Sequence, residues 1–478
     1  MPDDERPGDG STAVEGDGEA DDATAPDGAD DRVYYVVSDL HVGGDEQLGE
    51  VEFLDELLGF LADLETTDEN AELVVNGDAF GLWELTTAEG VEKFDVLVES
   101  YPELFEQLRE TGANVQITLL PGNHDHELAA YDEYVERFAE YNVDLVPEQS
   151  MQRRVGDSVV HFEHGNQQDP NNRIEDWGNE HATPLGYYYN TLVTSRAGQL
   201  SDRGRYNWLK DVQAVTPTER MPVWLLSKYF YREMNPVLRY ALVPFLLLFN
   251  VSAVLAVLAG LDLVGVWSTP VEWATAMLGQ FGTAGTAVWF LLAINVTVTG
   301  VVLLVGVPLY FLRRDVRKTI DRFGVFETDL TVDHEAPYER AALETFDENG
   351  DVRVFCHGHT HRPSVQSVDG GVVVNSGTWL KRLHRRDGVI GILPPVFYPS
   401  YQLCAVRIET TGGDGQVGNP ERGGGVAVEH VPVKKPSPSP EELTLTERLL
   451  TLGRKPDPGL PGGVVVEPDG SVRTRGGD

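Results

Sequence analysis

Six short apolar runs limit what this chain can fold into, because each one ends in polar or histidine-containing residues. Continuous apolar runs of this length are typical of buried strands. Apolar residues at helical spacing occupy 48–64 and 90–110, between the first three runs. The sequence therefore predicts an α/β fold with functional groups at the strand ends. The runs are RVYYVVSDLH (32–41), ELVVNGD (72–78), VQITLLPGNHD (115–125), SVVHFEHG (158–165), DVRVFCHGHTH (351–361) and GVVVNSGTW (371–379).

Histidines are concentrated in the fifth run. Of the 12 histidines in the chain, His357, His359 and His361 stand on alternate positions. Gly358 and Pro363 indicate that a strand over 352–356 ends before Gly358 and that a tight loop then carries the imidazoles. A solvated polar loop is the alternative interpretation of this stretch alone. The spacing suggests one half of a metal site, whose other half must come from elsewhere in the chain.

The charge of the chain excludes one class of function. There are 77 acidic and 37 basic residues, giving a formal net charge of −40, and the acid is spread along the whole length. Binding to nucleic acid needs a basic face, so no nucleic-acid partner is expected. Pervasive acidity with few lysines is typical of halophile proteins, in which high salt screens the repulsion between carboxylates. The composition therefore predicts a haloarchaeal source, with an ordinary acidic protein as the alternative. The two cysteines, Cys356 and Cys404, support neither a disulfide framework nor a cysteine zinc site.

Two long segments carry no charge, 241–261 and 285–312. Each is long enough to cross a hydrocarbon core of about 30 Å, and transmembrane helices are expected at about 241–261 and 287–311. Buried core helices are the alternative. Basic residues flank both ends of the pair, whereas the connection 262–281 has no Lys or Arg. The flanking charge predicts a multi-pass membrane protein whose termini and α/β domain are cytoplasmic.

Composition divides the chain into five regions. The first is rich in Asp, Glu, Gly and Ala without apolar periodicity, and is expected to be disordered. The last is Gly/Pro-rich and is expected to hold one short amphipathic helix at about 441–452. The predicted regions are an acidic tail (1–31), a first catalytic part (32–195), a helical insertion with both membrane segments (196–325), a second catalytic part (326–411) and a C-terminal tail (412–478).

The strand-end motifs D-x-H, G-D, G-N-H-D, H-G and G-H-T-H together resemble the calcineurin-like metallophosphoesterase superfamily, over roughly residues 32–180 and 340–380. The resemblance implies a four-layer αββα sandwich, here with an inserted helical cap and two transmembrane helices. GDAFGLWE (77–84), the segment 164–193 and GHTHRP are similar to the branch of UDP-2,3-diacylglucosamine diphosphatases, which cleave a pyrophosphate in a lipid precursor. Gly81 and Asn166 depart from that branch, where an acid is usual.

The resemblance also implies a centre of two divalent ions. Mixed imidazole and carboxylate ligands suit Mn, Fe or Zn, and two ions together can activate water and neutralise phosphoryl oxygens. One ion would be held by Asp39, His41 and His361, and Asp78 would bridge to the other. The seven expected ligands are Asp39, His41, Asp78, Asn123, His164, His359 and His361.

Other histidines receive other roles. His124 would be the non-ligand imidazole that protonates or polarises the leaving group, oriented by Asp125. His357 is interpreted as a packing or supporting residue in preference to a ligand, and His161 as structural. His126, just beyond the motif, is expected at the rim.

Together these features predict a membrane-anchored dimetal phosphoesterase that acts on a phosphate or pyrophosphate ester, with a lipid- or nucleotide-linked substrate favoured. The alternatives are a phosphoprotein or cyclic-nucleotide phosphatase, and a metal-stabilised scaffold without activity. The basic residues Arg362, Arg382 and Arg385 are candidates for binding an anionic head group; a solvated basic loop is the alternative for KRLHRR (381–386). The sequence predicts neither the ions nor the oligomeric state.

Overall fold

The computed structural model of the chain describes most of the predicted catalytic region and parts of the rest. The acidic tail 1–31 and residues 241–253 of the first predicted span lie outside the described residues. The described residues are 32–43, 51–191, 214–215, 220–236, 239, 254–255, 257–258, 260–262, 264–267, 269–322, 335–389, 393–411, 424–435, 443–454 and 459–475.

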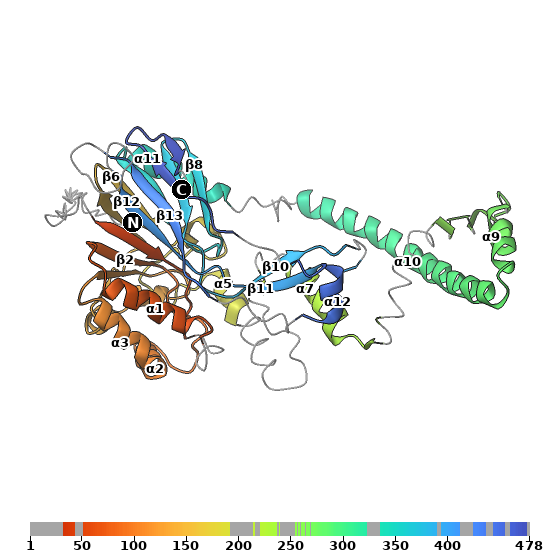
Figure 1. The fold of residues 1–478 in the computed structure, drawn as a ribbon, viewed down its shortest axis with the longest axis horizontal. Helices are drawn as coiled ribbons and strands as arrows, with labels where there is room; N and C mark the ends of the chain where they lie inside the picture. The colour runs from red at the N-terminus through yellow and green to blue at the C-terminus, as the bar shows by residue number, and fades with distance from the viewer. Residues whose placement is uncertain are drawn as a thin grey trace, which may run out of the picture.

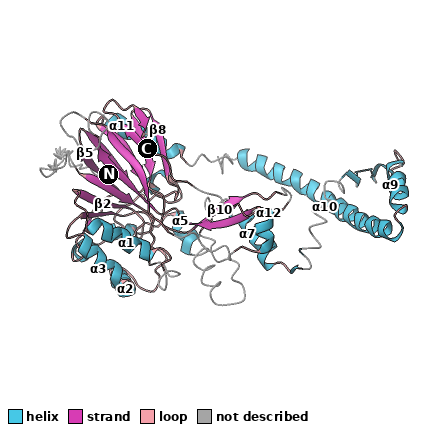
Figure 2. Ribbon diagram, in the orientation of Figure 1, coloured by secondary structure: helices cyan, strands magenta, loops and turns pink. Residues whose placement is uncertain are grey.

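Two sheets pack face to face and form the body of the molecule (Figures 1 and 2). The first has eight strands in the order β15-β14-β13-β12-β1-β2-β3-β4, and the second has five in the order β5-β6-β7-β9-β8. The strands of the first sheet are β1 (Val33–Val37), β2 (Ala71–Asn76), β3 (Gln116–Leu120), β4 (Val143–Leu145), β12 (Cys404–Thr410), β13 (Val426–Pro432), β14 (Val464–Val466) and β15 (Val472–Thr474). Those of the second are β5 (Ser150–Val155), β6 (Ser158–Glu163), β7 (Val352–His357), β8 (Ser364–Val368) and β9 (Gly371–Asn375).

Alternation along the strands explains the layers. In β1, Tyr34 and Val36 pack into the core between the sheets, whereas Val37 packs with the helices on the outer face. The helices of that face are α1 (Leu54–Glu65), α2 (Glu92–Ser100), α3 (Pro102–Thr111) and α4 (Asp132–Ala139). The helix α11 (Ala336–Glu348) packs on the outer face of the second sheet. The mixed α/β fold predicted from the sequence is thus confirmed.

Parallel pairing places the functional loops together. The strands β1, β2, β3 and β4 run parallel in one sheet, and β6, β7 and β9 run parallel in the other. The loops after their carboxyl ends therefore meet at one edge of the sandwich, where ligands bind in open α/β sheets. Short helical turns follow in this region: η2 (His126–Ala129), η3 (Asn166–Gln168) and α5 (Leu185–Tyr189).

The C-terminal region differs from the expected tail. The strand β13 pairs antiparallel with β12 over seven residues, and β14 and β15 extend the same sheet. The reason is visible in β13, whose first three residues, Val426, Ala427 and Val428, are all fully buried, as in a strand covered on both faces. The expected short helix is present as α12 (Leu445–Leu450), which begins with a capping box between Thr444 and Glu447.

A separate two-stranded sheet lies beside the sandwich (Figure 1). It consists of β10 (Arg382–Arg386) and β11 (Val396–Ser400), paired antiparallel. Small apolar clusters pack it against α7 (Met221–Lys228), the π-helical turn η7 (Tyr229–Glu233) and α12. Residues from the insertion, the second catalytic part and the C-terminal region thus share one subdomain.

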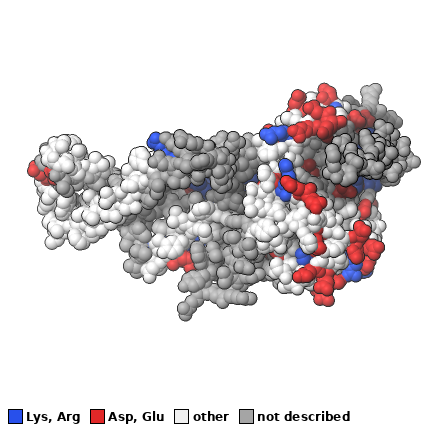
Figure 3. Space-filling model, turned by 180° about the vertical axis from the view of Figure 1, so that it is seen from behind, with Lys and Arg blue, Asp and Glu red and all other residues white. Residues whose placement is uncertain are grey.

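The insertion also forms a helical arm. The helix α10 (Gly282–Arg322) extends away from the sandwich and packs against α9 (Thr269–Gly279), which lies in the predicted connection (Figure 1). Within the described residues one segment, Gly282–Pro308, is long and apolar enough to cross a membrane. An 18-residue window within it has a mean hydropathy of 2.4 and is 12% buried. Two spans were expected. The described residues contain one candidate, and residues 241–253 of the other expected span lie outside them. Figure 3 shows this arm almost free of charge beside an acidic body.

Candidate metal centre

The loops after five strands bring the expected ligands to one edge of the sandwich. Each ligand follows its strand within a few residues, so the register of the sheets fixes where its backbone lies. Asp39 and His41 follow β1, Asp78 follows β2, Asn123 follows β3, His164 follows β6, and His359 and His361 follow β7.

The backbone of these loops is strained. Positive φ is uncommon for residues other than glycine and gathers at functional sites. Seven non-glycine residues in the described part of the chain have it, and five of them are expected metal ligands. This observation is independent of the motifs and points to the same site. The five are Asp39 (53°), His41 (47°), Asp78 (52°), His359 (65°) and His361 (58°).

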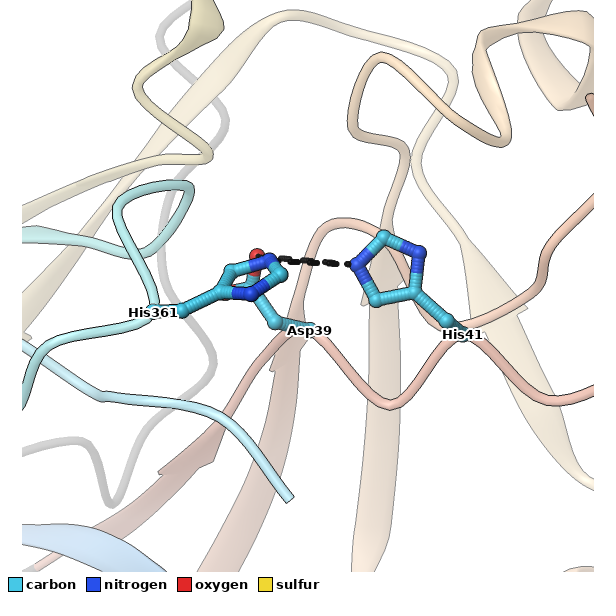
Figure 4. Close-up of side chains that lie close together, drawn as sticks. All are labelled: Asp39, His41 and His361. Carbon is cyan, nitrogen blue, oxygen red and sulfur yellow. Dashed lines mark hydrogen bonds and ion pairs between the residues drawn. The ribbon is translucent and has the colours of Figure 1, made fainter. Parts of the chain in front are cut away.

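The first cluster contains Asp39, His41 and His361 (Figure 4). The Nε2 atom of His361 lies 3.0 Å from Asp39 Oδ1 and 3.3 Å from the Nε2 atom of His41. Asp39 is fully buried, and its other oxygen accepts a hydrogen bond from the backbone N–H of His359 at 3.1 Å. Two imidazole nitrogens and a carboxylate oxygen therefore converge as a three-atom ligand set.

The second cluster contains Asp78, His164 and His359. His164 donates its Nδ1–H to the carbonyl of Asn76 at 3.0 Å, which leaves Nε2 as the ligand nitrogen, 3.0 Å from Asp78 Oδ2. The Nε2 of His359 lies 3.1 Å from Asp169, a residue that the sequence does not single out. Asp169 is thus positioned to orient a metal-ligating imidazole.

Asp78 connects the two clusters. Its Oδ2 atom also lies 3.6 Å from the Nε2 of His41, and its Oδ1 accepts a 2.7 Å hydrogen bond from the backbone N–H of His124. The remaining expected ligand, Asn123, is 1% exposed, and its Oδ1 has no hydrogen-bond partner among the described residues. A buried acceptor without a donor is costly, and a cation would satisfy it. These residues therefore fit a pair of divalent ions.

The electrostatics of the site favour bound cations. Burial alone would raise the pKa of Asp78, yet the neighbouring imidazoles of His164 and His124 hold it well below its usual range. Burial alone would lower the pKa of His164, yet Asp78 and Asp39 raise it to about 10. The two shifts report the mutual attraction of the Asp78 carboxylate and the His164 imidazole, which holds a proton on His164 when no metal is bound. Metal binding would release such protons, because a ligating imidazole is neutral.

The expected catalytic histidine has a different partner from the predicted one. His124 Nδ1 lies 2.9 Å from Glu84 Oε1, and its ring packs against Trp83 at an interplanar angle of 33°, with centroids 4.3 Å apart. Burial would lower the pKa of His124, but Glu84 and Asp78 raise it to about 9. The orienting carboxylate is therefore Glu84. It lies in the GDAFGLWE stretch, but nothing in its spacing predicts this contact.

Asp125 holds the loops instead of His124. Its carboxylate accepts hydrogen bonds from the backbone N–H groups of Gly122 (2.6 Å), Phe80 (3.1 Å) and Asp78 (3.2 Å). Burial and the nearby charge of Asp78 raise the pKa of Asp125 to about 7. Asp125 is thus a positioning residue for the loops that carry Asp78 and Asn123, and its predicted role is corrected.

The three other histidines given a role from the sequence are packing residues. His357 stacks on Tyr338 with centroids 4.1 Å apart, and burial lowers its pKa to about 3. His161 stacks on Phe355. His126 is 3% exposed, and its Nδ1 lies 3.1 Å from the carbonyl oxygen of Asn123, so it lies beneath the ligand loop and not at the rim.

The three candidate substrate-binding arginines are separated by the fold. Arg362 directly follows His361 and is partly buried, and Arg382 is buried on β10. Arg385 is exposed, and its guanidinium pairs with Asp387. The first two remain candidates for binding an anion.

We expect Gly122→Ala to disable the centre through Asp78. A Cβ atom at Gly122 would overlap Asp78 Oδ1 and lie 2.6 Å from the Asp78 backbone nitrogen. Because a displacement of about 1 Å can reduce turnover roughly 10²-fold, both turnover and metal content per chain should fall. In the matched control Gly59→Ala, the new methyl group in α1 has nothing within 4 Å. Full metal content in Gly122→Ala would contradict the placement of Asp78.

Comparison with known proteins gives one family-model match, over the N-terminal part of the chain. A model of the family described as "Calcineurin-like phosphoesterase" matches residues 33–255. No curated protein matches the sequence. Among solved structures, the chain is similar to a single mutant of Vps29 from Entamoeba histolytica, with 10% identity, a TM-score of 0.23, and coverage of 92% of this chain and 96% of the other.

Two further structures are similar at this level. One is a putative 5'-nucleotidase from Staphylococcus aureus, with 12% identity, a TM-score of 0.28, and coverage of 88% of this chain and 58% of the other. The second is a phosphopantetheinyl hydrolase from Mycobacterium tuberculosis, with 12% identity, a TM-score of 0.22, and coverage of 73% of this chain and 91% of the other. The match of residues 33–255 to this family model, together with the linked clusters of His and Asp, indicates that the protein is a metal-dependent phosphoesterase.

Proposed function

We propose that the protein hydrolyses a phosphate or pyrophosphate ester of a lipid- or nucleotide-linked substrate, and that the helical arm anchors it to a membrane. The observation that carries the chemistry is the position of Asp78, which belongs to the second cluster, lies 3.6 Å from His41 of the first, and accepts a hydrogen bond from the backbone N–H of His124. When bound, two divalent ions would activate the attacking water and stabilise the negative charge of the phosphoryl group. The rest of the chemistry falls to the residues of the chain.

His124 is the proposed proton donor. Its Nδ1 is directed to Glu84, so Nε2 is the nitrogen available to a leaving-group oxygen. Glu84 fixes the orientation of the ring and favours its protonated form, and the packing against Trp83 restricts the ring. A protonated imidazole held at the edge of the ligand clusters suits the departure of an alkoxide or phosphate.

The arm supports the proposed anchor. Its large apolar side chains face outward: Trp273, Phe290 and Leu304 are 67%, 66% and 75% exposed. A soluble protein rarely exposes such a continuous apolar surface. The arm is inserted in the sequence between His164 and His359, so it would hold the catalytic edge near a bilayer that also contains the substrate.

Turnover by the full-length protein tests this proposal. Purified protein in detergent, loaded with Mn²⁺, should hydrolyse bis(p-nitrophenyl) phosphate, and chelation should abolish the reaction. Products should then be sought from nucleotide-diphosphate lipids, phosphopeptides and cyclic nucleotides. A preference for either of the last two would overturn the proposed substrate class, and absence of turnover with any tested metal would overturn the hydrolytic role.

A soluble variant should separate anchoring from chemistry. Replacing residues 237–315 by a short polar loop removes most of the arm and none of the expected ligands. Hydrolysis of bis(p-nitrophenyl) phosphate should persist, whereas cleavage of a lipid-linked pyrophosphate in vesicles should slow by on the order of 10²-fold, because co-localisation raises the effective concentration. An unchanged ratio of the two rates would show that the arm contributes nothing to substrate access.

Labelling of single cysteines should reveal the proposed orientation. The two native cysteines, Cys356 and Cys404, are buried, so the background should be low. Cysteines placed in 262–281 should react with an impermeant thiol reagent added outside intact cells, and cysteines placed at the exposed positions Pro432 and Lys434 should react only after lysis. The reverse pattern would place the catalytic domain outside the cytoplasm.

A further inference from the structure

A buried cationic group on β10 is not explained by the metal centre. Arg382 is 7% exposed, in a chain whose net charge is −40. Its Nη1 donates a 3.3 Å hydrogen bond to Gln402 Oε1, and its Nε is buried without a partner in the described part of the chain. No ion pair of Arg382 forms among those described residues. Burial of a guanidinium without a counter-charge is unfavourable.

The surroundings of Arg382 add positive charge. Alternation along β10 places His384 on the same face of the strand, and His384 Nε2 is also buried without a partner among the described residues. Burial, followed by the charges of Arg362 and Arg220, lowers the pKa of Arg382 to about 10. Burial and the charges of Arg382 and Arg220 lower the pKa of His384 to about 4, so its imidazole is neutral at neutral pH.

The cluster begins beside the metal centre. Arg362 directly follows His361, whose imidazole contacts Asp39. A guanidinium presents a fork of N–H donors that matches two oxygens of a phosphate. Arg382 is a buried cation with an unpartnered Nε, and it lies close enough to Arg362 for the two charges to repel. A phosphate oxyanion would stabilise such a pair of guanidinium groups.

We propose that Arg382, Arg362 and His384 form a subsite for a second phosphate group of the substrate, distinct from the group that is hydrolysed. Its role in turnover rests on the proposed function, whereas its ability to bind phosphate does not. The substrate class is thereby narrowed to molecules that carry two phosphate groups, as in a diphosphate ester. Arg385 is excluded, because its side chain lies on the other face of β10 and pairs with Asp387 at 2.9 and 3.1 Å.

Inorganic phosphate titrated into the metal-free, full-length protein tests the subsite directly. Without ions, the carboxylates of the metal centre repel anions, so calorimetry reports the cationic cluster. Saturable binding is expected in the wild type, and Arg382→Gln should weaken it roughly tenfold, as for loss of a charged hydrogen bond. The matched control Arg385→Gln should leave the dissociation constant within about twofold, as for an exposed ion pair. Absence of saturable binding in the wild type, or equal binding in Arg382→Gln, would overturn the subsite.

A second variant and a second readout keep the result interpretable. Arg362→Gln changes a less buried member, so it tests the same cluster if Arg382→Gln does not fold. In the Mn²⁺-loaded protein, both variants should reduce the ratio of kcat/KM for a nucleoside diphosphate ester to that for bis(p-nitrophenyl) phosphate, and Arg385→Gln should not. If the wild type hydrolyses neither compound, the proposed function fails, while the phosphate titration still decides the subsite.

Discussion

Asp78→Asn is expected to cause the largest loss of activity of any single substitution, roughly 10³-fold or more, in line with loss of charge stabilisation in a two-metal site. Asp78 Oδ2 lies 3.0 Å from His164 and 3.6 Å from His41, one imidazole from each cluster. Asparagine keeps the size of the side chain but removes the negative charge that both ions need. Metal analysis should therefore show reduced occupancy at both positions, and not at one.

The control for this prediction is a matched change elsewhere. Asp144→Asn alters an exposed aspartate on β4, outside the ligand clusters, and should leave metal content and turnover unchanged. Comparison of melting temperatures with Mn²⁺ and with chelator adds a readout that does not depend on turnover, because bound ions stabilise the folded state. An Asp78→Asn protein with two bound ions and ordinary turnover would contradict the linking role of this carboxylate.

The ligand set could be predicted from the sequence because it depends on strand ends. A buried parallel strand is visible as an apolar run, and the residue after it lies at a known edge of the sheet. Asp39, Asp78 and His164 satisfy this rule directly, and the structure brings them together. The strained φ values of the same loops could not be predicted, since they follow from tertiary contacts.

The supporting residues depend on contacts between distant loops. Glu84 reaches His124, 40 residues away, and Asp169 reaches His359, across the whole insertion. No periodicity links such pairs, so a sequence motif can contain Glu84 without indicating its partner. Asp125 shows the opposite case. It adjoins His124 in the sequence, yet its carboxylate is used by three backbone amides.

The C-terminal strands were missed for a compositional reason. The strands β14 and β15 have three residues each, and glycine and proline separate them from α12. Such short runs resemble a linker until a partner strand is known. In the structure, β13 supplies that partner and completes the larger sheet. The general α/β pattern could thus be predicted, whereas the extent of the sheet required knowledge of the pairing.

The second large effect is expected at His124. His124→Ala should reduce turnover of esters with poor leaving groups by about 10²–10⁴-fold, the usual contribution of a general acid. Turnover of p-nitrophenyl esters should fall only about tenfold, because p-nitrophenolate departs with little need for a proton. Metal content should not change, since His124 is not one of the expected ligands. Equal losses for all leaving groups would indicate that His124 binds substrate or metal instead of donating a proton.

Glu84→Gln should reveal how the proton is held on His124. The acid is active when protonated, so activity is present below the pKa of His124 and lost above it. Glu84 raises that pKa, after burial has lowered it, through a carboxylate 2.9 Å from Nδ1. Removal of the charge should therefore move the alkaline limb of the pH profile to lower pH, while the exposed change Glu106→Gln on α3 should leave the profile unchanged. If the limb stays in place while turnover falls at every pH, Glu84 has a purely structural role. Control of the His124 proton would then belong to Asp78, the other carboxylate that raises the pKa of His124.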